Sequence, residues 1–292
     1  MTRSRRPARR HLAPVLALAA AVLLPTATAA GARAVTLARP GNVPVVDTLP
    51  SDTLPADAWN SARVRRLARE AVEARRHGWS DSTLVSFRAR ARGHVYFLGS
   101  LAPDAAAPGH GGDRLVRADQ VALRILWQAP GRSQQVLVGR RGERRLPTRV
   151  HYHVDHLTAV MENFGDRISM GEGTEVRDVV HPVSPEGLEL YDYRLVDSLG
   201  MRVAGRETEI YRVQVRPAEK GTAAVVGALH LEARSKAVVR LRVTFTPAAY
   251  RDPSLERITV DLESALWEGR WWLPARQTTT VRRRARWLDL PV

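Results

Sequence analysis

The stretch FRARARGHVYF, residues 87–97, decides the fold class, because its side chains change character at every second position. Small and apolar residues take one set of positions: Phe87, Ala89, Ala91, Gly93, Val95 and Phe97. The other set holds Arg88, Arg90, Arg92, His94 and Tyr96. Successive side chains of a strand point to opposite faces of its sheet. The stretch therefore predicts a strand with one covered face and one wetter face.

The same two-residue alternation recurs along most of the chain. It predicts further strands at 116–127, 136–138, 148–161, 191–196, 209–215, 224–232, 239–245, 258–263 and 271–282, with turns that include Arg141-Gly142 and Glu268-Gly269. Glycines and prolines interrupt the segment from Glu162 to Glu189. We therefore predict a mainly β (α+β) fold: a curved antiparallel sheet or half-barrel of roughly nine or ten strands.

One amphipathic helix is expected before the first of these strands. Asp57 or Ser61 can cap its start, and His77-Gly78 ends it. Its apolar residues recur at helical spacing: Val64, Leu67, Ala68, Ala71 and Val72. Because this stripe consists mostly of small residues, we expect it to pack on its own domain rather than on a membrane surface.

Residues 1–34 have the pattern of a secretory signal peptide. Arginines at the start precede an apolar run from Leu12 to Leu24, and small residues allow cleavage after Ala29 or Ala34. An uncleaved anchor is the alternative, and the export route, general or twin-arginine, stays open. Residues 35–57 contain four prolines and predict an extended linker. Residues 58–292 then form a single β-rich domain, and the expected location is the periplasm or the outer membrane.

Composition narrows the function classes. The 292 residues contain 45 Lys+Arg, 30 Asp+Glu and no cysteine, for a formal charge of +15. Without cysteine, the chain has no disulfides, thiolate metal sites or cysteine nucleophile. The arginines are dispersed among apolar residues, which favours a solvated strand face over an anion-binding surface and predicts no nucleic-acid partner. No apolar run after Ala34 is long enough for a transmembrane helix.

The string His151-Tyr152-His153-Val154-Asp155-His156 is the one motif that resembles catalytic chemistry. It is similar to the zinc-binding signature of the metallo-β-lactamase hydrolases. Alternation continues through it, so a strand would put His156 on the face opposite His151, His153 and Asp155. Only His181 and His230 follow downstream. We therefore predict no catalytic, cofactor-binding or metal-binding residues and no cofactor, with a metal-dependent hydrolase as an unlikely alternative.

Motifs of the C-terminal half resemble a known group of proteins. They are His181-Pro182-Val183-Ser184-Pro185, Tyr191-Asp192-Tyr193-Arg194-Leu195, Tyr211 to Pro217, Gly227-Ala228-Leu229-His230-Leu231 and Trp271-Trp272-Leu273-Pro274. The succession resembles the periplasmic β-rich region of uncharacterised Gram-negative outer-membrane proteins. The segment from Gly227 to Phe245 also looks like the lipoprotein-carrier fold of the LolA and LolB type, an open half-barrel closed by helices. The resemblance implies shelter for acyl chains.

These observations predict an exported, non-enzymatic envelope protein that holds a lipid or a lipidated partner in the concave face of its sheet. One alternative is a structural or interaction module of an outer-membrane assembly. Another is a truncated relative of a barrel-bearing outer-membrane protein. The identity of the ligand and the oligomeric state stay open.

Overall fold

The protein is mainly β, as the alternation predicts. The computed structural model describes residues 15–23, 58–80, 84–100, 114–129, 132–144, 157, 165–171, 173–203 and 206–284. Ten antiparallel strands form one sheet in the order β4-β3-β2-β1-β12-β11-β10-β9-β8-β7, and β5 and β6 form a second, two-stranded sheet. The sequence predicts roughly nine or ten strands, whereas these residues hold twelve.

The strands and helices have the following bounds, given in chain order. The strands are β1 (Val15–Leu23), β2 (Ser86–Ser100), β3 (Arg114–Gln128), β4 (Arg132–Arg144), β5 (Arg167–Met170), β6 (Val176–Val180), β7 (Tyr191–Val203), β8 (Arg206–Pro217), β9 (Val225–Glu232), β10 (Val238–Phe245), β11 (Leu255–Trp267) and β12 (Trp271–Arg284). The helices are α1 (Ala62–Ser80), α3 (Pro185–Leu190) and the short 3-10 helix η2 (Pro247–Ala249).

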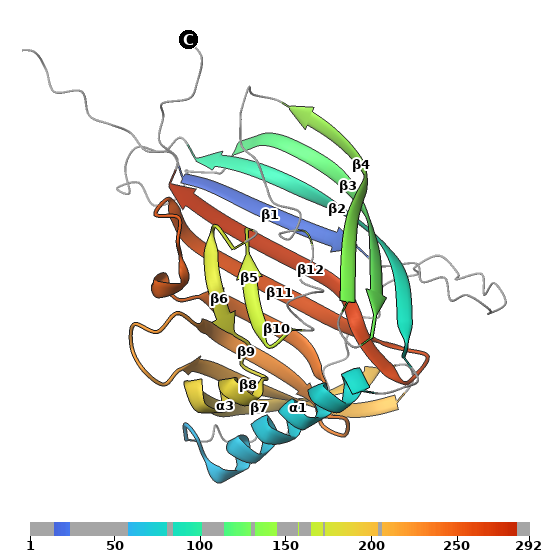
Figure 1. Ribbon diagram of the computed structural model, residues 1–292, viewed down its shortest axis with the longest axis vertical. Helices are drawn as coiled ribbons and strands as arrows, with labels where there is room; N and C mark the ends of the chain where they lie inside the picture. Colours follow the sequence, from blue (N-terminus) through green and yellow to red (C-terminus); the bar gives the residue numbers. More distant parts are fainter. Residues whose placement is uncertain are drawn as a thin grey trace, which may run out of the picture.

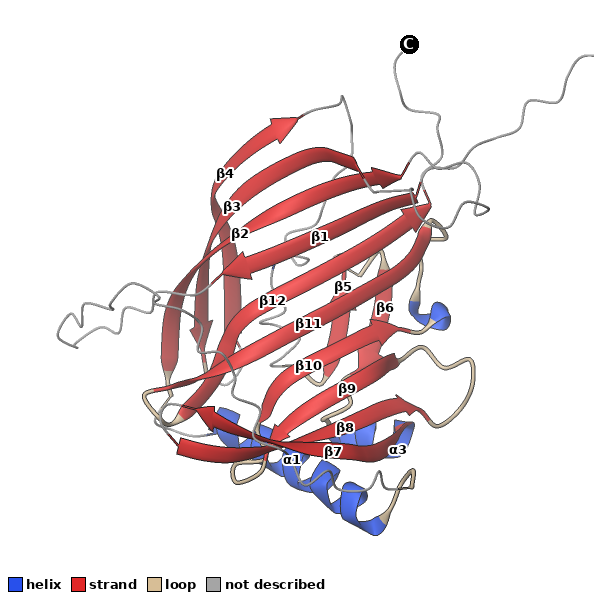
Figure 2. Cartoon of the chain, turned by 180° about the vertical axis from the view of Figure 1, so that it is seen from behind, coloured by secondary structure: helices blue, strands red, loops and turns tan. Residues whose placement is uncertain are grey.

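The main sheet curves around a separate layer of structure, which we call the cover: α1, α3, β5 and β6. Figure 1 shows the cover in front of the sheet, and Figure 2 shows it behind the sheet when the molecule is turned. The inner face of the sheet is buried and largely apolar on both sides of β1, in β2 and β3 and in β7 to β12, but it also holds buried polar residues: Arg117, Asp119, Gln277 and Thr279. Its apolar residues include Val121, Leu123, Val95, Phe97, Val281, Ile258, Val260, Leu241, Val243, Leu229, Leu231, Val213, Val215, Tyr193 and Leu195.

Strand β2 shows how the sequence builds this two-sided sheet. Ala89, Ala91, Val95 and Phe97 are buried, whereas the arginines that alternate with them are exposed. The same separation runs through β10, where Leu241, Val243 and Phe245 are buried. Burial of one apolar face stabilises the sheet, and the charged face stays in water.

Helix α1 adds its stripe of small residues to the same core. Val64, Leu67, Ala68, Ala71 and Val72 are all buried in the cluster that joins the cover to the sheet. Ser61 precedes the helix, and its Oγ accepts a hydrogen bond from the backbone N–H of Val64 at 3.2 Å. This contact satisfies one of the free N–H groups of the first turn. The helix crosses the lower end of the sheet beside β7 (Figure 1).

The N-terminal apolar run has a place in this structure that its sequence pattern does not predict. Val15–Leu23 forms β1, which pairs with β12 on one side and with β2 on the other. Removal of the leader stays a prediction. A chain cleaved after Ala29 or Ala34 would lose β1, and β2 and β12 would lose the strand that pairs with both.

The turn predicted at Arg141-Gly142 is wrong, because β4 continues through both residues. Gly142 lies opposite Asp119 of β3, whose side chain is fully buried. A Cβ atom at position 142 would lie 2.5 Å from the Asp119 Oδ1 atom. Arg117 Nε donates to that oxygen at 2.9 Å, and the Arg140 guanidinium lies 2.9 Å from Oδ2. The glycine therefore makes room for a buried ion pair instead of turning the chain.

The interrupted segment at 162–189 contains three short elements that the sequence pattern does not reveal. Strands β5 and β6 pair as a hairpin, and α3 follows with Ser184 as its N-cap. The Ser184 Oγ atom accepts a hydrogen bond from Gly187 N–H at 3.0 Å. The strand predicted at 148–161 lies outside the described residues, apart from Leu157, which is buried in the core.

Among the described helices, none has the length and apolar character needed to cross a membrane.

Gly227 provides a test of how closely the strands approach one another. It pairs with Val243 of β10 and with Val215 of β8. A Cβ atom at this position would lie 2.8 Å from Val243 Cα and would overlap the Arg242 carbonyl oxygen. We expect Gly227→Ala to lower the free energy of unfolding by about 1–3 kcal/mol, measured by urea titration.

Gly200→Ala is the matched control, because a Cβ atom there meets nothing within 4 Å. It should change the free energy of unfolding by less than about 0.5 kcal/mol. Equal losses in the two variants would contradict close strand approach as the reason for the glycine in β9.

Candidate functional site

The main sheet has two candidate sites, one on each of its faces. The first lies where the cover meets the concave face of the sheet. The second is a groove on the opposite face of the sheet, over β8 to β11.

Two buried tyrosines of β7 tie the cover to the sheet. The Tyr191 hydroxyl donates to the Val180 carbonyl oxygen at 2.7 Å and accepts from Val225 N–H at 3.2 Å. The Tyr193 hydroxyl lies 2.6 Å from the Pro182 carbonyl oxygen and 2.9 Å from that of Gly187. Burial raises the pKa of Tyr191 to about 12 and also raises the pKa of Tyr193. Both hydroxyls therefore remain protonated hydrogen-bond donors.

His181 lies in the segment between β6 and α3 and is fully buried. Its Nδ1 atom accepts a hydrogen bond from Val183 N–H at 2.9 Å, so the proton of the neutral ring belongs on Nε2. The Nε2 atom has no hydrogen-bond partner among the residues that the structure describes. Burial, and secondly the charge of Arg75, hold the pKa of His181 well below its usual value. The ring is therefore neutral at physiological pH.

Arg75 fastens the far end of α1 to the segment around His181. One terminal nitrogen lies 2.7 Å from the Val183 carbonyl oxygen and 3.0 Å from Asp166 Oδ1. The other donates to the Gly165 carbonyl oxygen. The cover is thus held together internally by polar contacts at a helix that also faces the apolar core.

A second polar fastening joins the cover to the last strand of the chain. Glu175, next to β6, is buried and pairs with Arg283 of β12. Arg283 also contacts Asp252 at 2.6 Å. The backbone adds one bridge between Val176 and Tyr250, and Arg251 N–H donates to the Glu175 carbonyl oxygen at 2.8 Å. These contacts lie at the rim of the cover, and apolar side chains fill the space inside.

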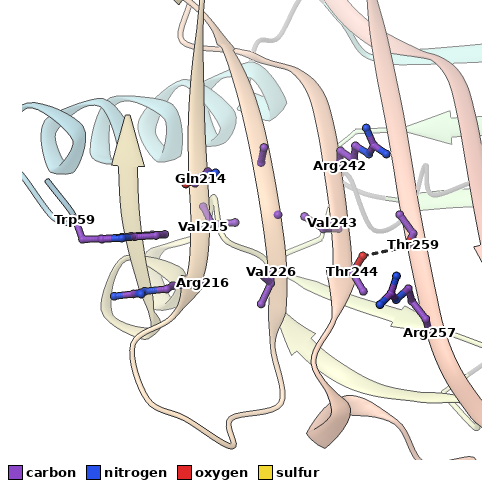
Figure 3. Close-up of a pocket in the computed structure, with 12 residues that line it drawn as sticks. Trp59, Gln214, Val215, Arg216, Val226, Arg242, Val243, Thr244, Arg257 and Thr259 are labelled. Atoms are coloured by element: carbon purple, nitrogen blue, oxygen red, sulfur yellow. Dashed lines mark hydrogen bonds between the residues drawn. The ribbon is translucent and has the colours of Figure 1, made fainter. Parts of the chain in front are cut away.

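The outer groove has a volume of about 520 Å³ and is shown in Figure 3. Its lining includes three arginines and no acidic residue. The residues are Trp59, Gln214, Val215, Arg216, Val226, Gly227, Ala228, Arg242, Val243, Thr244, Arg257 and Thr259. A hollow of about 570 Å³ over β2, β3 and β4 is also basic, but Arg140 there is engaged with buried Asp119.

Trp59 forms one wall of the outer groove and is held by contacts at the edge strand β7. The guanidinium of Arg216 stacks 4.0 Å from the centre of the Trp59 ring (Figure 3). Asp192 Oδ2 accepts from Arg216 Nε at 3.1 Å, and Asp192 Oδ1 accepts from Asn60 Nδ2 at 2.6 Å. Asn60 also exchanges two hydrogen bonds with the backbone of Tyr193. The indole is therefore preorganised.

The motif His151, His153, Asp155 and His156 lies outside the described residues, so the hydrolase alternative stays a prediction. Within the described ranges, no three His, Asp or Glu side chains converge as metal ligands. His181 is buried beneath the cover, whereas His230 lies on the outer face of β9, half-buried. The structure does not bring these two histidines together.

Sequence reasoning identified outward-facing arginines as a class but did not select Arg216, Arg242 and Arg257. The groove depends on which side chains face one another on neighbouring strands, and this follows only from the pairing register. No sequence pattern predicts that Trp59 lines the groove, because it lies just before a helix and the hydrogen bonds of Asn60 bring it to the sheet.

Comparisons of the chain with protein-family models, with curated proteins and with solved structures gave no match.

His181 predicts sensitivity of the fold to acid. Its pKa is lowered in the folded state, so its contribution to stability is complete above the unfolded value of about 6.5 and is lost as the pH falls below it. Each pH unit below that value costs about 1.4 kcal/mol until the folded pKa is reached. Between pH 7.5 and 5.5, the wild type should therefore lose about 1.4 kcal/mol more free energy of unfolding than His181→Asn.

His181→Asn retains an acceptor for Val183 N–H but cannot titrate, so it isolates the charge effect. The measurement is urea unfolding at the two pH values, and only the difference between them is compared. Parallel pH dependence in the wild type and the variant would show that His181 does not titrate in a buried site.

Proposed function

We propose that this chain is an exported, non-enzymatic cell-envelope protein that holds a lipid or a lipidated partner in the concave face of its curved sheet. The observation that carries the proposal is the layering. The largely apolar inner face of a curved sheet is covered by elements that belong to a separate two-stranded sheet and two helices.

The inner face has the chemistry that an acyl chain requires. It is lined mainly by aliphatic side chains of the main sheet, from β2 and β3 on one side of β1 and from β7 to β12 on the other. An acyl chain gains roughly 0.8 kcal/mol for each CH₂ group removed from water. A surface of this kind binds by apolar contact and does not need a polar recognition group.

Strand pairing attaches the cover at one place in the described part of the chain, and its other attachments to the sheet include side-chain contacts such as Tyr191 with Val180 and Glu175 with Arg283. In the described residues, β5 and β6 make a single isolated backbone bridge to the rest of the chain, Val176 to Tyr250. Helix α1 contributes mostly short side chains to the packing of the core: Ala68, Ala71 and Val72, beside Val64 and Leu67. An acyl chain would replace this apolar contact with an equivalent one when the cover moves outward.

A disulfide that locks the cover tests this proposal, and the absence of native cysteines makes the experiment clean. Val176 and Tyr250 form an antiparallel bridge in which Arg251 N–H bonds to Glu175, so they are a non-hydrogen-bonded pair. The Cα atoms of such a pair lie about 4.5 Å apart, within disulfide reach. We expect oxidised Val176→Cys/Tyr250→Cys to take up a fluorescent fatty acid at least tenfold more weakly than the wild type.

Reduction with dithiothreitol should restore uptake, which separates locking from damage to the fold. The matched control is Thr244→Cys/Thr259→Cys, because these residues pair between β10 and β11 and their hydroxyls lie 2.9 Å apart. That disulfide joins two strands of the main sheet and leaves the cover unlocked, so uptake should not change. A wild-type protein that binds no acyl probe at all would contradict the carrier role and favour the structural or interaction module.

A further inference from the structure

The outer face of the sheet carries a site that is distinct from the concave apolar face. We propose that the groove between Trp59 and Arg257 binds a phosphate ester, with the phosphate held at Arg242, Arg257 and the threonine pair between them. The groove faces away from the cover (Figure 3), so the two sites can be occupied independently.

Charge pairing on the rest of this face singles out the groove. Arg240 binds Asp261 through two hydrogen bonds of 2.8 and 2.6 Å and also approaches Glu263 at 3.4 Å. Arg212 pairs with Asp197 at 2.7 Å, and Arg282 pairs with Glu256 at 3.4 Å. Arg212, Arg240 and Arg282, outside the groove, are therefore each neutralised by a carboxylate on a neighbouring strand, whereas Arg276 of β12 has no ion pair among the described residues.

The arginines at the β10–β11 end of the groove lack this compensation. Arg242 reaches only Asp261, at 4.0 Å, and that carboxylate already binds Arg240. Arg257 makes no ion pair or hydrogen bond with any described residue. The groove thus keeps positive charge that an anion would neutralise, and guanidinium groups match the geometry of phosphate oxygens.

The register places hydrogen-bond donors at the centre of this positive end. Thr244 pairs with Thr259, so the two hydroxyls lie between Arg242 and Arg257 along the strands. The hydroxyls are 2.9 Å apart, and one donates to the other. That bond uses one of the two hydroxyl protons, and the second remains available to an acceptor in the groove. A phosphate oxygen is such an acceptor.

The opposite end of the groove suits the organic part of an ester. Trp59 and Val226 line it, and Val226 is 44% exposed although it is a large apolar residue. Gly227 has no side chain and Ala228 has only a methyl group, so neither fills the groove that they line. A ligand with a phosphate at one end and an organic group at the other would contact both the basic end and the apolar end of the groove. Glycerol phosphate headgroups and soluble organic phosphates share this arrangement.

The test compares two charge-removing double variants of the full chain. Arg242→Gln/Arg257→Gln removes two charges inside the groove, and Arg212→Gln/Arg282→Gln removes two from the same face outside it. Binding is measured to glycerol 3-phosphate by calorimetry and to vesicles of phosphatidylcholine with and without phosphatidylglycerol by cosedimentation, at low salt. We expect the groove variant to bind at least tenfold more weakly and the control to stay within twofold of the wild type.

The ligand arms distinguish the two sources of phosphate. Binding of glycerol 3-phosphate that depends on Arg242 and Arg257 assigns the site to soluble esters. Binding restricted to vesicles with phosphatidylglycerol, with the same dependence, assigns it to a lipid headgroup. Equal losses of binding in both double variants would show that only net charge matters, and would contradict a specific site in the groove. No binding to any of these probes by the wild type would overturn it as well, whatever the result for acyl uptake.

Discussion

The structure depends on the separation of the two faces of one antiparallel sheet. Inward positions of β2, β3 and β7 to β12 are mostly apolar and share a single core with α1 and β6. Outward positions carry arginines that pair across strands with aspartate and glutamate, as Arg240 does with Asp261. The inner face supplies the stabilisation, since ion pairs exposed to water add little. The outer face is therefore free to vary in charge without loss of the fold.

The alternation of apolar and polar residues is sufficient to predict this two-sided sheet, because a period of two residues is typical of half-buried β-strands. It is insufficient at positions where packing outweighs local preference. Arg141-Gly142 is a pattern typical of a turn, yet β4 continues through both residues. A glycine is needed at position 142 because Asp119 occupies the space that a side chain would fill. Strands β5 and β6 are short and flanked by glycines, so no periodicity marks them.

The candidate sites show the same limit of sequence reasoning. His181 and Tyr193 were noted only as parts of short motifs, and their contact with the cover depends on tertiary packing. The groove arginines belong to a class that alternation predicts, but their selection depends on which carboxylates neighbouring strands present. Arg257 and Arg240 look equivalent in sequence, and only the structure shows that Arg240 reaches diagonally across to Asp261, which lies opposite Arg242.

The position of β1 has a consequence for the timing of export. If the apolar run at 12–24 belongs to an export leader, the folded full-length chain holds its residues 15–23 as β1 between β2 and β12. A translocation machinery or peptidase would then meet it only before the sheet assembles. Sheets built from distant segments form slowly, and this delay would favour transport over premature folding. Slow assembly would thus be an advantage for this protein.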